Sequence, residues 1–245
     1  MMKLSYEQLT IGYSVGGCQQ MVVENLTGVL PTAALTCLVG RNGTGKSTFL
    51  RTLAGLQPPL AGQVLLDGIP MDSLSPIERA RMVSVVLTRH PDVQNLTVRE
   101  LVGMGRSPYT GFFGTLSVDD WQVVDEAISQ IGMTAWATRY IQTLSDGERQ
   151  KVMIAKALAQ QTPVILLDEP TAFLDYPSKV ELMQMLRQMA KEMDKTIVLS
   201  THDIELALQY ADRFLVMEAS FMHVKLPSEI GLDSFLDDAG HVAAH

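Results

Sequence analysis

Cysteine is scarce in this 245-residue sequence, which contains Cys18 and Cys37 and no others. Two cysteines without a patterned spacing form no disulfide framework, and such sparing use indicates a reducing compartment. An excess of positive charge is missing too, because 19 lysines and arginines stand against 27 acidic residues and leave a net charge of −8. That balance disfavours nucleic acid as the main partner.

Long hydrophobic runs are also absent from the sequence. No apolar stretch approaches the roughly 20 residues that a helix needs to cross a bilayer. The N-terminal segment contains Tyr6, Glu7 and Gln8 and no apolar core of a signal peptide. We therefore expect a cytoplasmic chain that reaches a membrane through a partner. Its length predicts a single α/β domain with an inserted helical region.

From Leu144 on, the predicted elements alternate between strand and helix, which is typical of a parallel sheet with crossover helices. The predicted strands are residues 34–39, 63–66, 83–87, 164–168, 196–200 and 214–217, and the predicted helices among them are 47–56, 151–160, one that ends at 195, and 204–211. In this division residues 1–88 and 144–218 form a catalytic core. The pattern fades after Glu218, so residues 219–245 are expected to be a C-terminal tail.

Residues 89–143 are predicted to form a helical subdomain within that single domain. Thr97–Glu100 has the pattern of a capping box and opens one helix. Ser117 opens another helix, which is expected to run to Gly132. The link at residues 105–114 is rich in turn-forming residues and is expected to be a loop.

Residues 40–47, Gly-Arg-Asn-Gly-Thr-Gly-Lys-Ser, fit the phosphate-loop pattern G-x-x-x-x-G-K-[ST]. The glycines let successive backbone N–H groups converge on phosphate oxygens without a Cβ in the way. Lys46 brings a compact positive charge to the β- and γ-phosphates, and Ser47 offers a hydroxyl to Mg²⁺. A glycine-rich turn with an incidental lysine is the alternative. The predicted strand before the motif and the helix after it favour a nucleotide site.

A second region, residues 144–175, contains the groups that such a phosphate site needs. The run Leu144-Ser145-Asp146-Gly147-Glu148 opens a helix whose free N–H groups and dipole can bind an anion. Asp168 and Glu169 follow a buried strand, where one carboxylate can hold a metal ion and its neighbour can orient a water. An acidic pair that merely faces water is the alternative. The apolar run before the pair and Pro170 after it favour a site.

Together and in this order, the motifs resemble those of the nucleotide-binding subunit of an ATP-binding cassette (ABC) transporter, from about Leu9 to about Glu218. Residues 40–47 match the family's Walker A motif, 144–148 its signature motif, 165–169 Walker B with the catalytic glutamate, 172–175 the D-loop and 201–203 the switch histidine. The resemblance implies the α/β P-loop NTPase fold of an ABC cassette. That fold has a mainly parallel sheet with crossover helices, an N-terminal antiparallel β part and a helical subdomain.

The resemblance also implies a role for each matching residue. Glu169, His202 and Lys46 are the expected catalytic residues, with Glu169 orienting the attacking water and His202 contacting the γ-phosphate. Contacts to ATP are expected from Tyr13, Gly40, Arg41, Asn42, Gly43, Thr44, Gly45, Lys46, Ser47, Thr48, Ser145, Asp146, Gly147, Glu148 and Asp175. Mg²⁺ is expected on Ser47, Asp168 and Thr88. Tyr13 stands where the family places an aromatic that stacks on adenine, although an aromatic at the end of such a strand is often a core residue.

Three positions depart from the family's pattern. The glutamine that usually follows the strand 83–87 is replaced in register by Thr88, and Gln94 is the alternative for its role. Asp146 replaces a signature glycine, and we expect its side chain to point away from the γ-phosphate and to cap the helix N-terminus. Arg41 stands where proline is common. None of these departures removes a catalytic group.

The expected function is ATP hydrolysis that drives import. Gly105-Arg106-Ser107-Pro108, Leu116-Ser117 and Asp119-Asp120 resemble the helical region of importers for iron–siderophores, haem and vitamin B12, in which ATPase and permease are separate chains. The expected partners are a second copy bound head to tail through ATP, a transmembrane permease and, indirectly, a substrate-binding protein. The alternatives are a soluble ABC ATPase without a permease, such as an iron–sulphur-assembly ATPase, and a nucleotide-binding regulator that does not hydrolyse ATP.

A docking site for the permease is expected between the loop 88–95 and the segment 97–114. This region mixes charge with apolar side chains, which suits a protein interface. The side chains expected to line it are Arg89, His90, Val93, Leu96, Phe112 and Phe113. An ordinary loop beside a core aromatic is the alternative.

Overall fold

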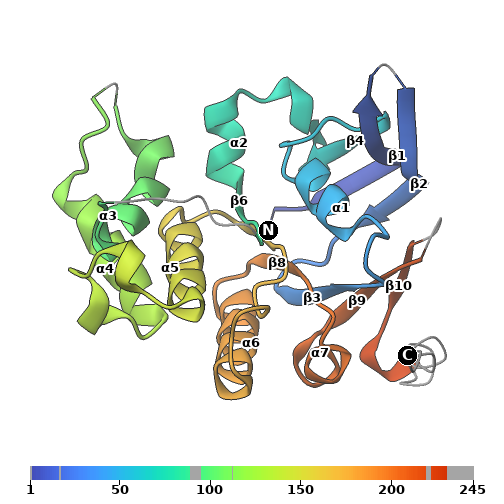
Figure 1. Cartoon of the computed structure of the whole chain (residues 1–245). Coiled ribbons are helices and arrows are strands. Elements are labelled where there is room, and N and C mark those ends of the chain that lie inside the picture. Colours follow the sequence, from blue (N-terminus) through green and yellow to red (C-terminus); the bar gives the residue numbers. More distant parts are fainter. Residues whose placement is uncertain (1, 17, 89–94, 112, 219–221, 231–245) are drawn as a thin grey trace.

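The computed structural model describes residues 2–16, 18–88, 95–111, 113–218 and 222–230. Its centre is a six-stranded sheet in the order β10-β9-β3-β8-β7-β6 (Figure 1). The strands are β3 (Ala34–Val39), β6 (Val83–Val86), β7 (Val164–Leu167), β8 (Thr196–Ser200), β9 (Arg213–Met217) and β10 (Met222–Lys225). All neighbours from β9 to β6 are parallel, and β10 is antiparallel to β9. The prediction of a mainly parallel sheet is confirmed.

This sheet is buried on both faces, as strand β7 illustrates. Val164 and Leu166 belong to the core cluster that includes α1 (Lys46–Leu53), whereas Ile165 and Leu167 belong to the cluster that includes α6 (Tyr176–Glu192) and α7 (Ile204–Tyr210). Successive residues of a strand point to opposite faces, so a strand covered on both sides is apolar throughout. Because the strands from β9 to β6 are parallel, their carboxyl ends meet at one edge of the sheet, where the predicted site residues follow them.

An antiparallel sheet covers the α1 side, as predicted for the N-terminal part. Its order is β2-β1-β4-β5. The strands are β1 (Leu4–Val15), β2 (Cys18–Val29), β4 (Ala61–Leu66) and β5 (Ile69–Pro70), and two helices follow them, η1 (Met71–Ser73) and α2 (Pro76–Met82). Tyr6 of β1 packs edge-on against Phe49 of α1, with ring centroids 5.4 Å apart. This contact joins the sheet to the helix that follows the phosphate loop.

The helical region lies on the other side of the molecule from the antiparallel sheet (Figure 1). It contains α3 (Val98–Gly103), η2 (Met104–Tyr109), α4 (Val118–Gln130), η3 (Thr134–Trp136), η4 (Ile141–Thr143) and α5 (Asp146–Ala159). Thr97 opens α3 with the predicted capping box, and Ser117 opens α4, as predicted, through a second capping box with Asp120. Helix α5 packs against α3 and α4 and also against β6, so it joins this region to the core.

Two regions of the chain differ from the expectations. The link 105–114 contains the 3₁₀ helix η2, because residues such as Gly105 and Arg106 pack inward instead of facing solvent. The chain also adds β10 and the short helix η5 (Pro227–Glu229) beyond Glu218, where the sequence pattern fades. Within the described part of the chain, no helix is both long and apolar enough to span a membrane.

Candidate nucleotide site

The phosphate loop connects β3 to α1 at the edge of the sheet formed by the carboxyl ends of the parallel strands. Gly45 is the N-cap of α1 and has φ 102°, in the left-handed region that favours glycine. A Cβ at this position would lie 2.3 Å from Cγ1 of Val22 on β2. The loop is therefore closed by a turn that only glycine fits, and it leaves the N-terminus of α1 open to an anion.

Lys46 lies inside the loop rather than in solvent. Its side chain is buried, and Nζ donates hydrogen bonds to the carbonyl oxygens of Gly40 at 2.7 Å and Arg41 at 3.0 Å. Burial lowers the pKa of Lys46, while the nearby carboxylates of Glu169 and Asp168 oppose this shift. An ammonium group already positioned at the loop is suited to hold phosphate oxygens, and the acidic pair is close enough to act on the same ligand.

A hydroxyl that the sequence analysis missed holds the acidic pair together. Ser200, the last residue of β8, donates a 2.7 Å hydrogen bond from Oγ to Oδ1 of Asp168 and accepts a 2.8 Å bond from the backbone N–H of Glu169. Asp168 is buried at the end of β7, and its N–H bonds to the carbonyl of Val86 at 2.8 Å. A hydroxyl at the carboxyl end of the adjacent parallel strand is the signal that could have identified Ser200.

Glu169 has an unusual backbone conformation. Its φ is 50°, in the left-handed region, which costs a non-glycine residue about 1–3 kcal/mol. The bond to Ser200 holds this conformation in place. Oε2 of Glu169 lies 3.9 Å from Nδ1 of His202, whose side chain is more than half exposed. The structure thus brings these two predicted catalytic residues together beside Asp168.

Tyr13 lies at the end of β1 and contacts the helix after the phosphate loop. Its hydroxyl is hydrogen-bonded to Oγ1 of Thr48, a buried residue of α1. Tyr13 itself is 42% exposed, so it is not a core aromatic. An exposed ring beside the phosphate loop is placed to stack on a base, and its contact with adenine stays a prediction.

Thr88 follows β6 and reaches the backbone of the acidic pair. Its hydroxyl donates a 3.0 Å hydrogen bond to the carbonyl oxygen of Asp168. The hydroxyl proton of Thr88 is therefore used in this hydrogen bond, and the hydroxyl oxygen can still accept a bond through its lone pairs. A metal or water role for Thr88 stays a prediction. Gln94, the alternative for this role, lies outside the described residues.

The signature segment begins α5 with a capping box. Ser145 Oγ accepts the N–H of Glu148 at 3.3 Å, and Oε2 of Glu148 accepts the N–H of Ser145 at 2.8 Å. The expectation that Asp146 caps this helix is wrong, because Ser145 is the N-cap and Asp146 forms an ion pair with Arg149 at 3.3 Å. Ser145 takes the N-cap position because its hydroxyl accepts a bond from the N–H of Glu148, while the carboxylate of Glu148 accepts a bond from the N–H of Ser145.

The signature segment also contacts the D-loop of the same chain. A Cβ on Gly147 would lie 3.0 Å from the carbonyl oxygen of Phe173. Asp175 ends the D-loop as the N-cap of α6, and its Oδ1 accepts the N–H of Ser178 at 3.1 Å. The hydrogen bonds to Ser178 lower the pKa of Asp175, which favours the charged form. Signature and D-loop therefore form one continuous surface.

This surface lies apart from the phosphate loop of its own chain. Figure 1 shows α5 and α1 on different sides of the central sheet. Lys46, Asp168, Glu169 and His202 form one half-site, and residues 145–148 with Asp175 form a second surface. The structure brings the predicted residues together in these two groups, not in one.

Oxygen ligands at the first half-site fit Mg²⁺. Asp168 offers a carboxylate and Ser47 a hydroxyl, which are the hard ligands that Mg²⁺ prefers alongside phosphate oxygens and water. Among the described residues, no group of three or more His, Cys, Asp or Glu side chains could hold a metal ion.

A phosphate loop between a parallel strand and a helix, with an acidic pair at the end of a strand in the same sheet, defines a P-loop nucleoside triphosphatase. Comparison with known proteins narrows this class. The family model of the ABC transporter matches residues 23–172. The chain belongs to the ABC transporter family, and it is an ATP-binding ATPase of that family.

Several relatives cover most of the chain. The ABC transporter ATP-binding protein MJ0873 of Methanocaldococcus jannaschii is 40% identical over 215 residues, which cover 88% of this chain and 73% of the relative. The iron(3+)-hydroxamate import ATP-binding protein FhuC of Bacillus subtilis is 37% identical over 218 residues, with coverages of 89% and 80%. The ferric enterobactin transport ATP-binding protein FepC of Escherichia coli is 36% identical over 229 residues, with coverages of 93% and 83%.

Solved structures confirm the fold. A metal-chelate type ABC transporter in an inward-facing conformation is 26% identical, with a TM-score of 0.81 and coverages of 96% of this chain and 88% of that one. The dimeric ABC transporter cassette MJ0796 is also 26% identical, with a TM-score of 0.81 and coverages of 91% and 98%. The same cassette has been solved in a post-hydrolysis state bound to ADP and Pi.

Proposed function

We propose that this chain is the ATP-hydrolysing subunit of an importer for an iron–siderophore, haem or cobalamin-type substrate, and that it works with a separate permease at the cytoplasmic face of the membrane. The observation that carries the proposal is the similarity to FhuC and FepC along nearly the whole chain, including the helical region. Both relatives are named for transport of ferric chelates. A ferric siderophore is therefore the favoured substrate.

The two separate surfaces support a head-to-tail dimer. In such a dimer, ATP bound by Lys46 and Ser47 of one copy would be covered by Ser145 and Gly147 of the other. A related cassette with a TM-score of 0.81 has been solved as a dimer, which supports a dimer of this chain. Each site would then be half-built in a single copy, so hydrolysis would require assembly.

The residues of the first half-site have distinct proposed roles. Lys46 binds the phosphates, and Ser47 with Asp168 would hold Mg²⁺, which when bound would neutralise phosphate charge. Glu169 orients the attacking water as a general base, a contribution of typically 10² to 10⁴ in rate. His202, close to Glu169, contacts the γ-phosphate. Ser200 fixes Asp168 and Glu169 relative to each other before the nucleotide arrives.

Uptake by a strain that lacks this chain tests the transport role. The strain is given radiolabelled ferric siderophore, haem or cobalamin in separate assays and is complemented with the parent chain or with Glu169→Gln. We expect loss of uptake for one of the three substrates, restoration by the parent and no restoration by the variant. Unchanged uptake of all three would contradict the importer and would leave a soluble ABC ATPase, such as an iron–sulphur-assembly ATPase.

A further inference from the structure

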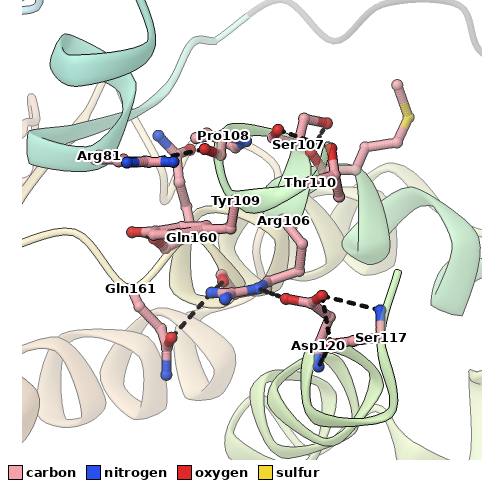
Figure 2. Close-up of polar contacts among 12 residues, drawn as sticks. Arg81, Arg106, Ser107, Pro108, Tyr109, Thr110, Ser117, Asp120, Gln160 and Gln161 are labelled. Carbon is pink, nitrogen blue, oxygen red and sulfur yellow. Dashed lines mark hydrogen bonds and ion pairs between the residues drawn. The ribbon is translucent and has the colours of Figure 1, made fainter. Parts of the chain in front are cut away.

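The 3₁₀ helix η2 contains an arginine that is buried among three acceptors (Figure 2). Arg106 is 7% exposed. Its guanidinium donates 2.9 Å hydrogen bonds to Oδ1 of Asp120, to the carbonyl oxygen of Ala159 and to Oε1 of Gln161. It also lies over the ring of Tyr109, 4.2 Å from the centroid. A planar, rigid donor set of this kind fixes the relative position of every group it binds.

One of these acceptors ends α5 and another, Gln161, lies just beyond the helix. Ala159 is the last residue of the helix, where unpaired carbonyls and the helix dipole favour a cation. Tyr109 adds a 2.9 Å hydrogen bond from its hydroxyl to the carbonyl of Gln160. A Cβ on Gly105 would lie 2.3 Å from the carbonyl oxygen of Lys156, so η2 approaches α5 as closely as backbone allows. We call this set of contacts the η2 clamp.

The same clamp reaches the core of the protein. Arg81 of α2 donates a 2.9 Å hydrogen bond to the carbonyl of Pro108 and lies over the ring of Tyr109 at 5.4 Å. Gln160 Nε2 donates to the carbonyl of Val83, at the start of β6, at 3.2 Å. Figure 2 shows Arg81 and Arg106 on opposite sides of Tyr109. Three parts of the chain therefore meet at one point, namely the helical region, the end of α5 and the core.

The opposite end of α5 carries the signature residues Ser145–Gly147. The helix has 14 residues and is therefore about 21 Å long. A helix of this length transmits a shift at one end to the other, because its hydrogen bonds hold it as a rigid body. The outward side of η2, with Met104 and Tyr109 partly exposed, is open to a partner.

We propose that Arg106 is a positioning residue for ATP hydrolysis, which holds the C-terminal end of α5 so that the signature residues at its other end meet the nucleotide bound by the second copy. The inference rests on the head-to-tail dimer of the proposed function. It predicts a defect in the site that the variant chain completes for its partner, and no defect in the site where the variant chain binds ATP itself.

Mixing experiments with an inactive excess chain separate these two sites. A Lys46→Ala chain in large excess forces nearly every reporter chain into a mixed dimer, whose one working site combines the reporter's phosphate loop with the signature of the excess chain. The rate is measured per reporter chain at saturating MgATP. In one arrangement the excess chain carries Lys46→Ala and Arg106→Met and the reporter is the parent. In the other, the excess chain carries Lys46→Ala alone and the reporter carries Arg106→Met.

We expect the rate to fall about tenfold or more in the first arrangement, because a small misplacement of a group that contacts the reacting substrate has effects of that size. In the second arrangement we expect a rate within about twofold of the parent. Arg106→Lys keeps the charge, but the single nitrogen of an ammonium group lacks the planar fork with which the guanidinium reaches its three acceptors. It should therefore also lower the rate in the first arrangement and not in the second. Tyr109→Phe, which removes only the hydroxyl bond to Gln160, should show a weaker version of this asymmetry.

Arg99→Met is the matched control. Arg99 also pairs with an aspartate, Asp125, at 2.6 and 2.9 Å and lies over an aromatic ring, that of Trp121, at 4.2 Å. These contacts join α3 to α4 without touching α5. Arg99→Met should leave both arrangements within about twofold of the parent.

The outcomes distinguish a failure of the role proposed for Arg106 from a failure of the head-to-tail dimer. Equal losses in both arrangements, or no loss in either, would overturn the role of Arg106. A further excess chain with Lys46→Ala and Ser145→Arg tests the dimer itself, because it should abolish the reporter's activity. If the reporter stayed active with that chain, the head-to-tail dimer would be wrong. If Arg106→Met does not fold, the asymmetry is decided with Arg106→Lys and Tyr109→Phe.

Discussion

Lys179 forms a 2.7 Å salt bridge with Asp203, which joins α6 to the loop that carries His202. The backbone N–H of Lys179 also bonds to the carbonyl of Asp175, the D-loop residue that caps the same helix. One turn of α6 therefore holds the D-loop at one side and the switch histidine at the other. In the proposed head-to-tail dimer the second copy would contact the D-loop, and this pair would then connect dimer formation to the position of His202.

Lys179→Met should lower the rate of ATP hydrolysis while leaving ATP binding to the single chain unchanged. A partly buried pair of this kind contributes about 1 kcal/mol, so we expect a loss of several-fold. Lys179→Arg should retain most of the activity. The control is Lys191→Met at the other end of α6, where Lys191 pairs with Asp212 at 3.1 Å. Equal effects of Lys179→Met and Lys191→Met would show that only helix stability had changed.

Glu169→Gln should bind MgATP and hydrolyse it about 10² to 10⁴ times more slowly than the parent, because the amide cannot act as a general base. The variant should accumulate as an ATP-bound dimer, which gel filtration with MgATP detects. Glu205→Gln, an exposed position in the first turn of α7, is the control. Turnover by Glu169→Gln near the parent rate would make the assignment wrong.

Ser200→Ala should raise the Mg²⁺ concentration needed for half-maximal activity. The hydroxyl bridges the carboxylate of Asp168 and the N–H of Glu169, and a buried group left without its partner costs about 1–3 kcal/mol. Ser84→Ala is the matched control, because Ser84 is also a buried strand hydroxyl and bonds to Oγ1 of Thr162 at 3.0 Å. If both variants titrate with Mg²⁺ as the parent does, Ser200 has no part in holding the metal.

The strands and helices that position the site residues can be predicted from the sequence. The contacts between these elements are predicted less well. Strands such as β7 and β8 are predictable because uninterrupted apolar runs end in polar groups. The capping boxes at Thr97 and Ser117 are local patterns that no distant contact overrides. Ser200 has no such pattern, since its function depends on β8 lying beside β7. The backbone conformation of Glu169 cannot be predicted from the sequence either, because the fold imposes a positive φ that glutamate does not favour by itself.

The surroundings of Arg106 show the same limit. Gly105 and Pro108 indicate a loop in the sequence, yet contacts with the end of α5 turn this segment into a 3₁₀ helix with a buried arginine. Asp146 was expected to be a cap because aspartate caps well, but the neighbouring Ser145 forms a reciprocal bond with Glu148. At Arg106 a distant part of the chain decides the local structure, whereas at Asp146 the reciprocal bonds of the neighbouring Ser145 and Glu148 decide it.

Phe113→Asp should release the chain from membranes that contain the permease while leaving basal ATP hydrolysis largely intact. Phe113 is 90% exposed beside η2, which suits a docking residue. Leu96, also expected there, packs against the core, so its substitution would affect folding as well. Val93, Arg89, His90 and Phe112 lie outside the described residues. Val224→Asp on β10 is the control at another exposed apolar position, and equal membrane retention of both variants would place the docking surface elsewhere.

The last prediction concerns acid stability and the carboxylate of Asp120. Hydrogen bonds from the side chain and backbone of Ser117, and then from Arg106, lower the pKa of Asp120 to about 2. A carboxylate whose pKa is lower in the folded state than in the unfolded state stabilises the fold above the unfolded pKa of about 3.9, and this contribution disappears as the pH falls toward the folded value.

Asp120→Asn should therefore lower the free energy of unfolding by a constant amount between about pH 7 and pH 5, and the difference from the parent should shrink between about pH 4 and pH 2. Urea unfolding across this range measures it. Asp119→Asn removes the same charge from the neighbouring exposed position in the first turn of α4 and serves as the control. A difference for Asp120→Asn that stays constant down to pH 2 would show that its carboxylate does not gain its charge-dependent stability from Ser117 and Arg106.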